Sequence, residues 1–201
     1  MVITPPDYPD YRDYYDLERY VSETVRHRFQ QDGYLSAFDF FCIVIWKANR
    51  AKSKIADKLL RDGPKKYTDL DSAVKDLTRQ IGAPSDANEK MKVLVQEWKF
   101  RLRMASAILT ILYPENFTVY DARVSRALQE LTGRSFHNLS NSTAFDTIWM
   151  GYQEFKEQVQ RLEAGGVHLA SLRDKDRYLW GKSFHDRLNR DIRYNFQKIE
   201  E

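Results

Sequence analysis

Apolar residues recur at helical spacing along most of the chain. Between Ser72 and Ile81, for example, Ala73, Val74, Leu77 and Ile81 fall on one face of a helix. No segment of convincing length alternates apolar and polar residues, as a half-buried β-strand would. The pattern therefore predicts an all-α protein.

Turn and capping residues divide this pattern into separate helices. We expect helices at about residues 17–30, 36–49, 52–61, 72–81, 85–98, 100–112, 122–131 and 140–163, with one or two more between 169 and 201. Expected N-caps, whose side-chain oxygens can accept from first-turn N–H groups, are Ser36, Thr68 or Asp71, Asp121 and the run Ser140–Thr143. Gly133 is expected to end the 122–131 helix.

The apolar faces indicate which helices form the core. Residues 40–45 are apolar nearly all round, which predicts a central helix. Ala105, Ser106 and Ala107 form a small-residue face that would let another backbone come close. In the last segment the residues expected to point inward are Leu172, Leu179, Trp180, Phe184, Leu188, Ile192 and Phe196.

Length and composition set the domain organisation. With 201 residues, 42% of them apolar, the chain can form one large domain or two closely packed lobes. Residues 1–20 are acidic and rich in tyrosine, and we expect an arm there, followed by one helical domain over residues 21–201. No apolar run is long enough for a membrane span, and the N-terminus lacks the features of a signal peptide. Cys42 stands alone, which fits a reducing setting; we expect a cytoplasmic monomer.

Positive charge is clustered although the net charge is only +3. From Lys47 to Lys66, eight basic residues face only Asp57 and Asp62, and a second cluster consists of Lys99, Arg101 and Arg103. Such clusters favour a polyanionic partner, because each neutralised phosphate releases counterions. The alternative interpretation is an ordinary solvated helix face.

Residues 101–128 contain the most informative pattern. A buried helix ends before Pro114, a short extended segment follows at 117–120, and Asp121 then begins a new helix in the sequence Tyr120-Asp121-Ala122-Arg123-Val124-Ser125-Arg126. This order resembles the core of the helix-hairpin-helix DNA glycosylase superfamily, which carries Val-Asp-x-His-Val-x-Arg there. The interval from Ala105 to Asp121 equals that of the endonuclease-III-like branch. In addition, Trp46-Lys47 with Arg50 looks like the WK-x-x-R segment of glycosylase-like bacterial proteins.

The resemblance implies a two-lobed helical bundle that binds DNA in the cleft between its lobes. Asp121 would be the essential carboxylate of an N-glycosylase that flips out and removes a modified base. The residues that would contact DNA or the base are Trp46, Lys47, Arg50, Lys99, Arg101, Arg103, Tyr120, Arg123 and Arg126. For Arg123 and Arg126 a structural ion pair is the competing interpretation. The candidates for stacking on an extruded base are Trp46, Trp98, Tyr120 and Trp180, and for each of them simple core packing is the competing interpretation.

Three departures from the superfamily narrow this implied activity. Its Leu-Pro-Gly-Val-Gly hairpin corresponds to Glu97-Trp98-Lys99-Phe100-Arg101, which has no glycine. The lysine of the backbone-cleaving branch is replaced by Arg103, which cannot form a Schiff base, so we expect a monofunctional enzyme without lyase activity. The cysteine ligands of an iron–sulfur loop are missing, and the histidines show no metal-ligand spacing. We therefore expect no cofactor and no metal.

The chemistry of a glycosidic bond gives Asp121 a role without reference to any family. Cleavage leaves positive charge on the sugar, so a fixed carboxylate beside it stabilises the transition state and can activate water. Asp121 could instead be an N-cap and nothing more. The rival hypothesis is a non-catalytic module on a degenerate glycosylase scaffold that binds nucleic acid or protein. The identity of the base, and the choice of DNA or RNA, stay open.

Overall fold

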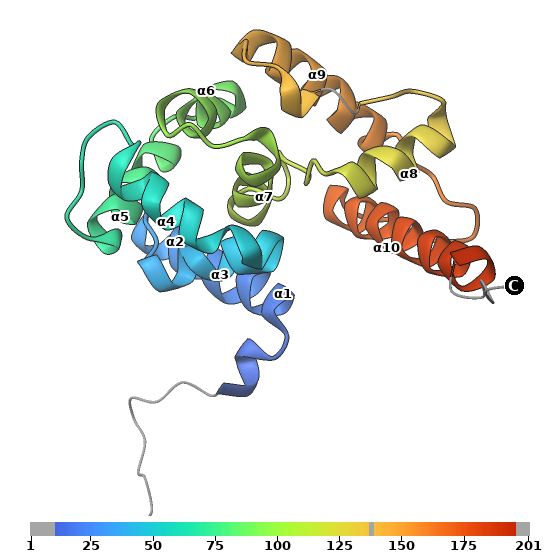
Figure 1. Cartoon of the computed structure of the whole chain (residues 1–201), viewed down its shortest axis with the longest axis horizontal. Coiled ribbons are helices and arrows are strands. Elements are labelled where there is room, and N and C mark those ends of the chain that lie inside the picture. Colours follow the sequence, from blue (N-terminus) through green and yellow to red (C-terminus); the bar gives the residue numbers. More distant parts are fainter. Residues whose placement is uncertain (1–10, 137–138, 196–201) are drawn as a thin grey trace, which may run out of the picture. The chain divides into compact units, whose positions relative to one another are not determined.

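The structure is a computed structural model that describes residues 11–136 and 139–195. Every regular element in these two ranges is a helix, and the only bridge between extended residues there joins Ala164 to Val167. The predicted all-α class is therefore confirmed. The chain divides into two compact units, residues 1–83 and residues 84–201 (Figure 1).

The first unit consists of helices that follow one another with short turns. Its elements are η1 (Tyr11–Tyr14), α1 (Leu17–Arg19), η2 (Tyr20–Val25), α2 (Arg26–Asp32), α3 (Ala37–Ala48), η3 (Asn49–Ala51), α4 (Lys52–Arg61) and α5 (Leu70–Gly82). In α3, Phe40, Ile43 and Val44 are completely buried, as expected for a central helix. Ile45 is 36% exposed, so α3 is not covered on every side.

The second half of the expected arm belongs to this first unit. The helical segment that starts at Leu17 continues through residue 20 into η2 without a break. Tyr20 is buried and its hydroxyl donates to Asp39 of α3 at 3.0 Å, while the ring of Tyr14 lies edge-on at 4.9 Å from that of Tyr20. The predicted boundary at residue 20 is therefore not seen, because burial and hydrogen bonding tie this region to the core. Residues 1–10 of the expected arm lie outside the described residues.

The second unit contains residues 101–128, the segment on which the expected resemblance rests. Its elements are α6 (Ala87–Lys92), η4 (Val93–Glu97), α7 (Leu102–Leu112), α8 (Ala122–Thr132), η5 (Leu139–Asn141), α9 (Phe145–Gln160), α10 (Leu172–Arg190) and η6 (Asp191–Asn195). Every residue of α7 except Arg103 is buried, so this helix forms the core of the unit. Helix α8 packs against α10 (Figure 1).

Local capping chemistry explains several of the observed helix ends. Ser36 and Asp121 are N-caps, and Gly133 ends α8 in the left-handed conformation with φ 75°, as predicted. Two expected caps are wrong. Helix α5 is capped by Asp69, whose Oδ1 accepts from the N–H of Ser72 at 2.8 Å. Asp71 lies in the first turn and accepts from the N–H of Ala37 at 2.7 Å. Helix α9 follows Ala144, because the chain before it forms the separate turn η5.

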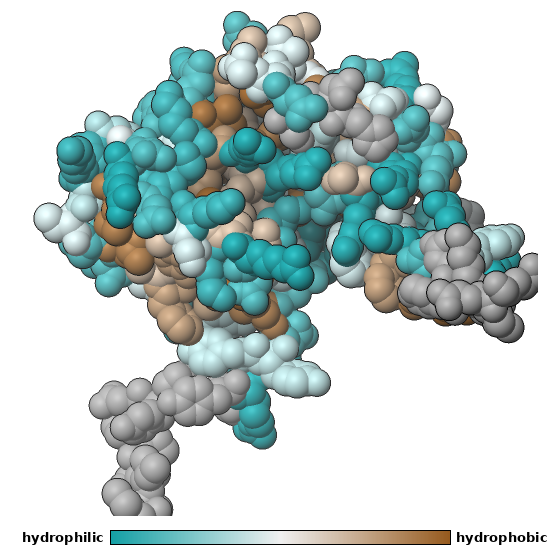
Figure 2. Space-filling view, in the orientation of Figure 1, coloured by the Kyte–Doolittle hydropathy of each residue, from teal (hydrophilic) through white to brown (hydrophobic). Residues whose placement is uncertain are grey.

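The predicted inward face of the last helix is also wrong. Leu179 is fully buried, but Trp180, Phe184, Leu188 and Ile192 are 40–51% exposed. Leu172 is half-buried, and Phe196 lies outside the described residues. The physical reason is that α10 packs on α8 and α9 through one side only. The apolar residues spaced four apart, from Trp180 to Ile192, lie on another side of the helix. In the space-filling view of Figure 2, apolar and hydrophilic side chains lie next to each other over the region of α10.

None of the described helices combines the length and the apolar character that are needed to cross a lipid bilayer.

Candidate functional site

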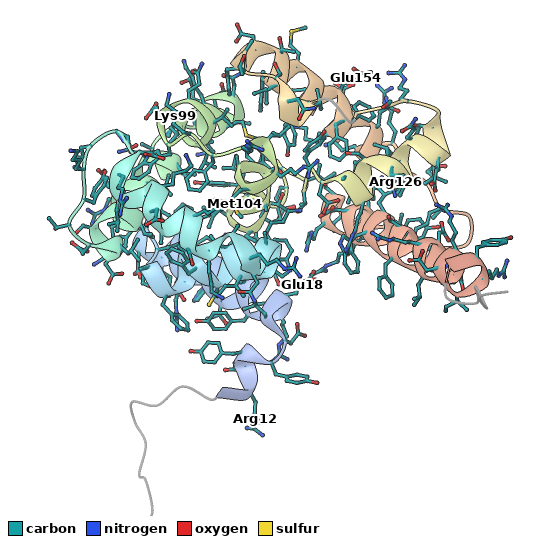
Figure 3. The ribbon with its side chains drawn as sticks, in the orientation of Figure 1. Arg12, Glu18, Lys99, Met104, Arg126 and Glu154 are labelled. Atoms are coloured by element: carbon teal, nitrogen blue, oxygen red, sulfur yellow. The ribbon has the colours of Figure 1, made fainter. Side chains whose placement is uncertain are left out.

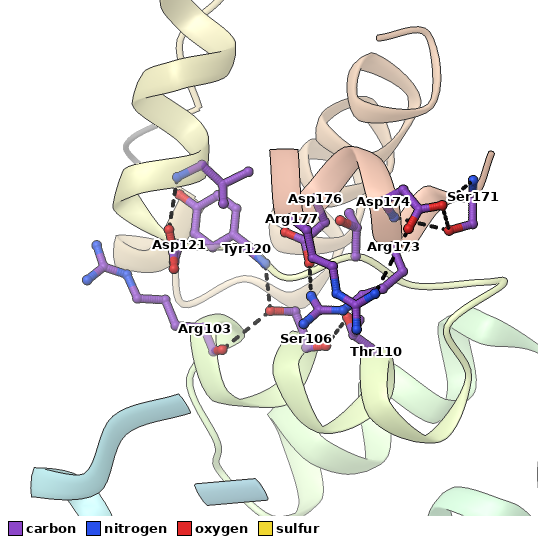
Figure 4. A network of polar contacts seen from close by, with 12 residues as sticks. Arg103, Ser106, Thr110, Tyr120, Asp121, Ser171, Arg173, Asp174, Asp176 and Arg177 are labelled. Carbon is purple, nitrogen blue, oxygen red and sulfur yellow. Dashed lines mark hydrogen bonds and ion pairs between the residues drawn. The ribbon is translucent and has the colours of Figure 1, made fainter. Parts of the chain in front are cut away.

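The segment that leads to Asp121 is extended, buried and without a partner strand. Phe117, Thr118, Val119 and Tyr120 are each at most 5% exposed. The N–H of Phe117 donates to the backbone carbonyl of Tyr113 at 3.1 Å, and side chains supply partners for Thr118 and Tyr120. The hydroxyl of Ser106 on α7 accepts from the N–H of Tyr120 at 3.0 Å (Figure 4). The side chains of Ser106 and of Tyr152 on α9 thus take the place of a neighbouring strand at two points of the segment.

The second holding residue is Tyr152 of α9. Its hydroxyl accepts from the N–H of Thr118 at 3.0 Å and donates to the carbonyl of the same residue at 2.9 Å. Burial raises the pKa of the Tyr152 phenol, and the carboxylate of Asp176 raises it further. The phenol therefore keeps its proton and can both donate and accept at this backbone position.

Asp121 is fixed at the end of this held segment. Its Oδ1 accepts from the backbone N–H groups of Arg123 at 2.8 Å and Val124 at 2.9 Å, at the start of α8. The residue is half-buried, and so is not enclosed in the hydrophobic interior. The N-terminus of α8 favours the ionised form of a carboxylate placed there. The side chain is thus an oriented carboxylate that solvent can reach.

The hairpin that precedes α7 is formed without glycine. Between η4 and α7 the chain turns sharply at Trp98–Arg101, and Lys99 adopts φ 58°, the only positive φ of a non-glycine residue in the described ranges. The turn is closed by backbone hydrogen bonds from Trp98 to Val93 at 3.0 Å and from Phe100 to Leu94 at 2.8 Å. In the resemblance inferred from the sequence, Lys99 corresponds to the first glycine of the superfamily hairpin.

This hairpin presents three cations next to the N-terminus of a helix. Lys99, Arg101 and Arg103 are all exposed. Figure 3 shows Lys99 at the turn between the α6 segment and α7. Arg101 is the N-cap of α7 and makes no side-chain capping bond, so the first N–H groups of α7 have no side-chain cap. Cations and helix-terminal N–H groups together suit an anion such as a phosphate.

The two arginines of α8 have different surroundings. Arg126 is exposed (Figure 3), and within residues 11–136 and 139–195 it makes no ion pair. The guanidinium of Arg123 lies 5.3 Å from the centre of the Trp180 ring on α10, in a cation–π contact. The structure thus brings Arg123, a predicted DNA contact, together with Trp180, which the sequence did not link to it.

Tyr120 is a core residue, which corrects its predicted role as a base contact. It is 1% exposed, its hydroxyl donates to the carbonyl of Phe136, and its ring lies edge-on at 5.2 Å from that of Phe155. Trp98 is likewise completely buried. Large aromatic side chains are most stable when buried in apolar surroundings, so Tyr120 and Trp98 are core residues, as the core-packing interpretation holds.

The remaining predicted site residues belong to the first unit. Trp46 and Lys47 lie in the last turn of α3 and are half-buried, while Arg50 lies in η3 and is exposed. Their expected position in a cleft stays a prediction.

Two residues that position the Asp121 segment were not identified as such from the sequence. The sequence pattern predicts only a small-residue role for Ser106, although a hydroxyl in an otherwise apolar helix is a signal for a buried hydrogen bond. Tyr152 has no comparable signal, because its partner Thr118 is 34 residues away. The described histidine, cysteine, aspartate and glutamate side chains form no group of three or more that could hold a metal ion.

Comparisons with known proteins add no relative to this picture. No protein-family model matches the chain, and no curated protein or solved structure matches it.

Proposed function

We propose that this chain is a DNA N-glycosylase-like hydrolase without lyase activity, with Asp121 as its essential carboxylate. The observation that carries the proposal is the fixed position of Asp121. Its Oδ1 is held by two N–H groups of α8, and the segment before it is held by Ser106. A catalytic carboxylate must keep its orientation while charge develops on the substrate, and these contacts supply that orientation.

The proposed reaction uses Asp121 in two ways. Its negative charge stabilises the sugar as the bond to the base breaks and the ring becomes cationic. The same carboxylate orients, and takes a proton from, the water that attacks the sugar, while the base leaves with the bonding electrons. Hydrolysis is the expected outcome, because Arg103 stands where a lyase would need a lysine and cannot form a Schiff base.

The hairpin would hold the DNA backbone. Lys99, Arg101 and Arg103 are exposed around the uncapped N-terminus of α7, and Arg126 is exposed on α8. These side chains support phosphate contacts that position the duplex without reading its sequence. For Trp46, Lys47 and Arg50 of the first unit, contacts to DNA are proposed because the resemblance implies them.

The test is base release from a panel of duplexes that carry different modified bases. Wild-type protein is expected to release at least one base, and Asp121→Asn to lower the rate by about 100-fold or more. Asparagine can still accept the two capping N–H groups, so the substitution removes the charge and keeps the cap. Equal rates for the two proteins would refute the proposed role of Asp121.

A non-catalytic binding module is the second candidate. The observation that favours it is that Oδ1 of Asp121 already serves as an ordinary N-cap, in a scaffold whose hairpin has no glycine. In that case, wild-type protein would bind duplex DNA through Lys99, Arg101 and Arg103 and release no base from any member of the panel. Binding without release therefore separates the two candidates.

A further inference from the structure

The solvent-facing side of α10 and η6 carries exposed aromatic rings. Trp180 is 44% exposed, Phe184 is 51% exposed and Tyr194 is 68% exposed. Exposed rings in this number are unusual for a helix surface that has no function, because each leaves apolar area in contact with water. None of these residues belongs to the hairpin or to the Asp121 segment.

The most exposed charged residues on the same segment are basic. The exposed arginines are Arg177, Arg187, Arg190 and Arg193. The four aspartates between residues 172 and 195 are buried or half-buried, and each is paired: Asp174 with Arg177 at 3.9 Å, Asp176 with Arg173, Asp186 with Lys182, and Asp191 with Arg187 at 3.6 Å. Arg190 and Arg193 make no ion pair within the described part of the chain. The surface of this helix is therefore cationic.

The rings are arranged in a way that suits flat ligands. Trp180 and Phe184 are one helical turn apart, and their rings are parallel within 2°, with centres 5.8 Å apart. Arg123 of α8 adds a guanidinium group 5.3 Å from the centre of the indole ring. Parallel aromatic rings bordered by arginines are the arrangement on which nucleic-acid bases stack while phosphates meet the cations.

We propose that this face of α10 and η6 binds a single strand of DNA. Bases of a single strand stack on Trp180, Phe184 and Tyr194, and its phosphates contact the exposed arginines. A duplex is a poorer ligand, because its bases are stacked on one another and do not present their faces. A second copy of the same face is disfavoured, since it would bring arginines against arginines. The choice of DNA rests on the proposed function, whereas binding to this face does not depend on Asp121.

The test measures binding of the full chain to a fluorescein-labelled oligothymidylate by fluorescence anisotropy. Two reference ligands are an abasic strand of the same length, which has phosphates without bases, and a duplex. Wild-type protein is expected to bind oligothymidylate more tightly than the abasic strand. Binding to the duplex, for which the hairpin is proposed, should be unchanged when the α10 rings are removed. The double variant Trp180→Ala/Phe184→Ala is expected to weaken that binding by about 10-fold or more. A matched control, Leu131→Ala/Met150→Ala, removes side chains that are 48% and 71% exposed elsewhere in the same unit and should bind as wild type.

The charge contribution is tested by salt. Replacing Arg187, Arg190 and Arg193 by glutamine should reduce the slope of log affinity against log salt by about 2, since each single-strand contact contributes about 0.7. Equal affinity for the abasic strand and oligothymidylate, or unchanged binding by the Trp180→Ala/Phe184→Ala variant, would overturn the proposal. So would sedimentation that reveals a wild-type dimer lost in this variant, because the face would then belong to a second copy. The base-release assay with Asp121→Asn does not enter these measurements, so the two proposals fail separately.

Discussion

The hydroxyl of Ser106 accepts a hydrogen bond from the backbone N–H of Tyr120 at 3.0 Å, and this bond joins the core helix α7 to the residue before Asp121. Both partners are at most 1% exposed. A small side chain at residue 106 lets the extended segment come close, and its oxygen supplies the acceptor that a neighbouring strand would otherwise provide. The position of Asp121 therefore depends on a contact made within the core.

The first prediction concerns Ser106→Ala. The substitution leaves the buried N–H of Tyr120 without its acceptor, so we expect the free energy of unfolding to fall by about 1–3 kcal/mol. Chemical denaturation measures this difference. Ser135→Ala, on the exposed chain after α8, is the control and should change stability by no more than about 0.5 kcal/mol. Equal stability of the two variants would show that the Ser106 bond contributes nothing.

The second prediction concerns Tyr152→Phe. The ring stays in place, but the hydroxyl that both accepts from and donates to Thr118 is lost. Since the two backbone groups are buried, we expect a loss of about 1–3 kcal/mol in the free energy of unfolding. Tyr194→Phe, at a residue that is 68% exposed, is the matched control and should be neutral within about 0.5 kcal/mol. A neutral Tyr152→Phe would mean that water replaces the hydroxyl.

Helix positions could be predicted from the sequence where local chemistry decides them. The helix expected at residues 52–61 is found there, because basic and apolar residues at helical spacing run into the break at Gly63-Pro64. Helix α8 begins after Asp121 and ends at Gly133 for equally local reasons: an oxygen that caps N–H groups and a residue without Cβ.

Contacts between distant residues could not be predicted in this way. The bonds that hold the extended segment join residues 14 and 34 positions apart, and nothing in the local sequence specifies them. An apolar stripe on α10 indicates a helix with two unlike faces, but it does not tell whether another element covers that stripe. The exposure of Trp180 and Phe184 is thus a property of the tertiary structure, and so is the burial of Tyr120.

The third prediction separates two roles of the Asp121 side chain: capping of α8 and supply of a negative charge to the reaction. Asp121→Ala removes the acceptor of two N–H groups, and we expect the free energy of unfolding to fall by about 1 kcal/mol. Asp121→Asn keeps an oxygen acceptor and should stay within a few tenths of wild type, although its rate of base release is expected to fall. Thermal and chemical unfolding of both variants provide the comparison. If asparagine destabilised the protein as much as alanine, a loss of activity could no longer be assigned to the missing charge.

The fourth prediction uses Cys42 as a probe of the first unit. Burial, and then the nearby negative charge of Asp39, raise the pKa of this thiol from 9.0 to about 11. At pH 8 the folded chain therefore holds about 100-fold less thiolate than an ordinary cysteine, and alkylation should be correspondingly slow. Mass spectrometry can follow the reaction in native and denatured protein, with the denatured chain as the reference.

The same pKa shift of Cys42 has a defined effect on stability. The unfolded thiol ionises near pH 9 and the folded thiol near pH 11, so ionisation favours the unfolded state once the pH exceeds 9. The contribution of this residue is thus fully present below pH 9 and is lost as the pH rises toward 11. Native alkylation at pH 8 as fast as that of the denatured chain would contradict both statements.

The last prediction is that glycine is more stable than alanine at residue 99, the opposite of the order found within a helix. Its φ of 58° lies in the left-handed region, where a Cβ is unfavourable by about 1–2 kcal/mol. Lys99→Gly should therefore be more stable than Lys99→Ala by about 1 kcal/mol, and both variants lose the same charge. Lys92 has φ −62° and ψ −44° inside the preceding helical segment, so there glycine should be less stable than alanine by about 0.5–1 kcal/mol. Chemical unfolding of the four variants tests whether glycine is more stable than alanine at residue 99 and less stable at residue 92. A more stable alanine at residue 99 would show that the hairpin does not adopt the glycine-like turn on which its proposed contact with phosphate depends.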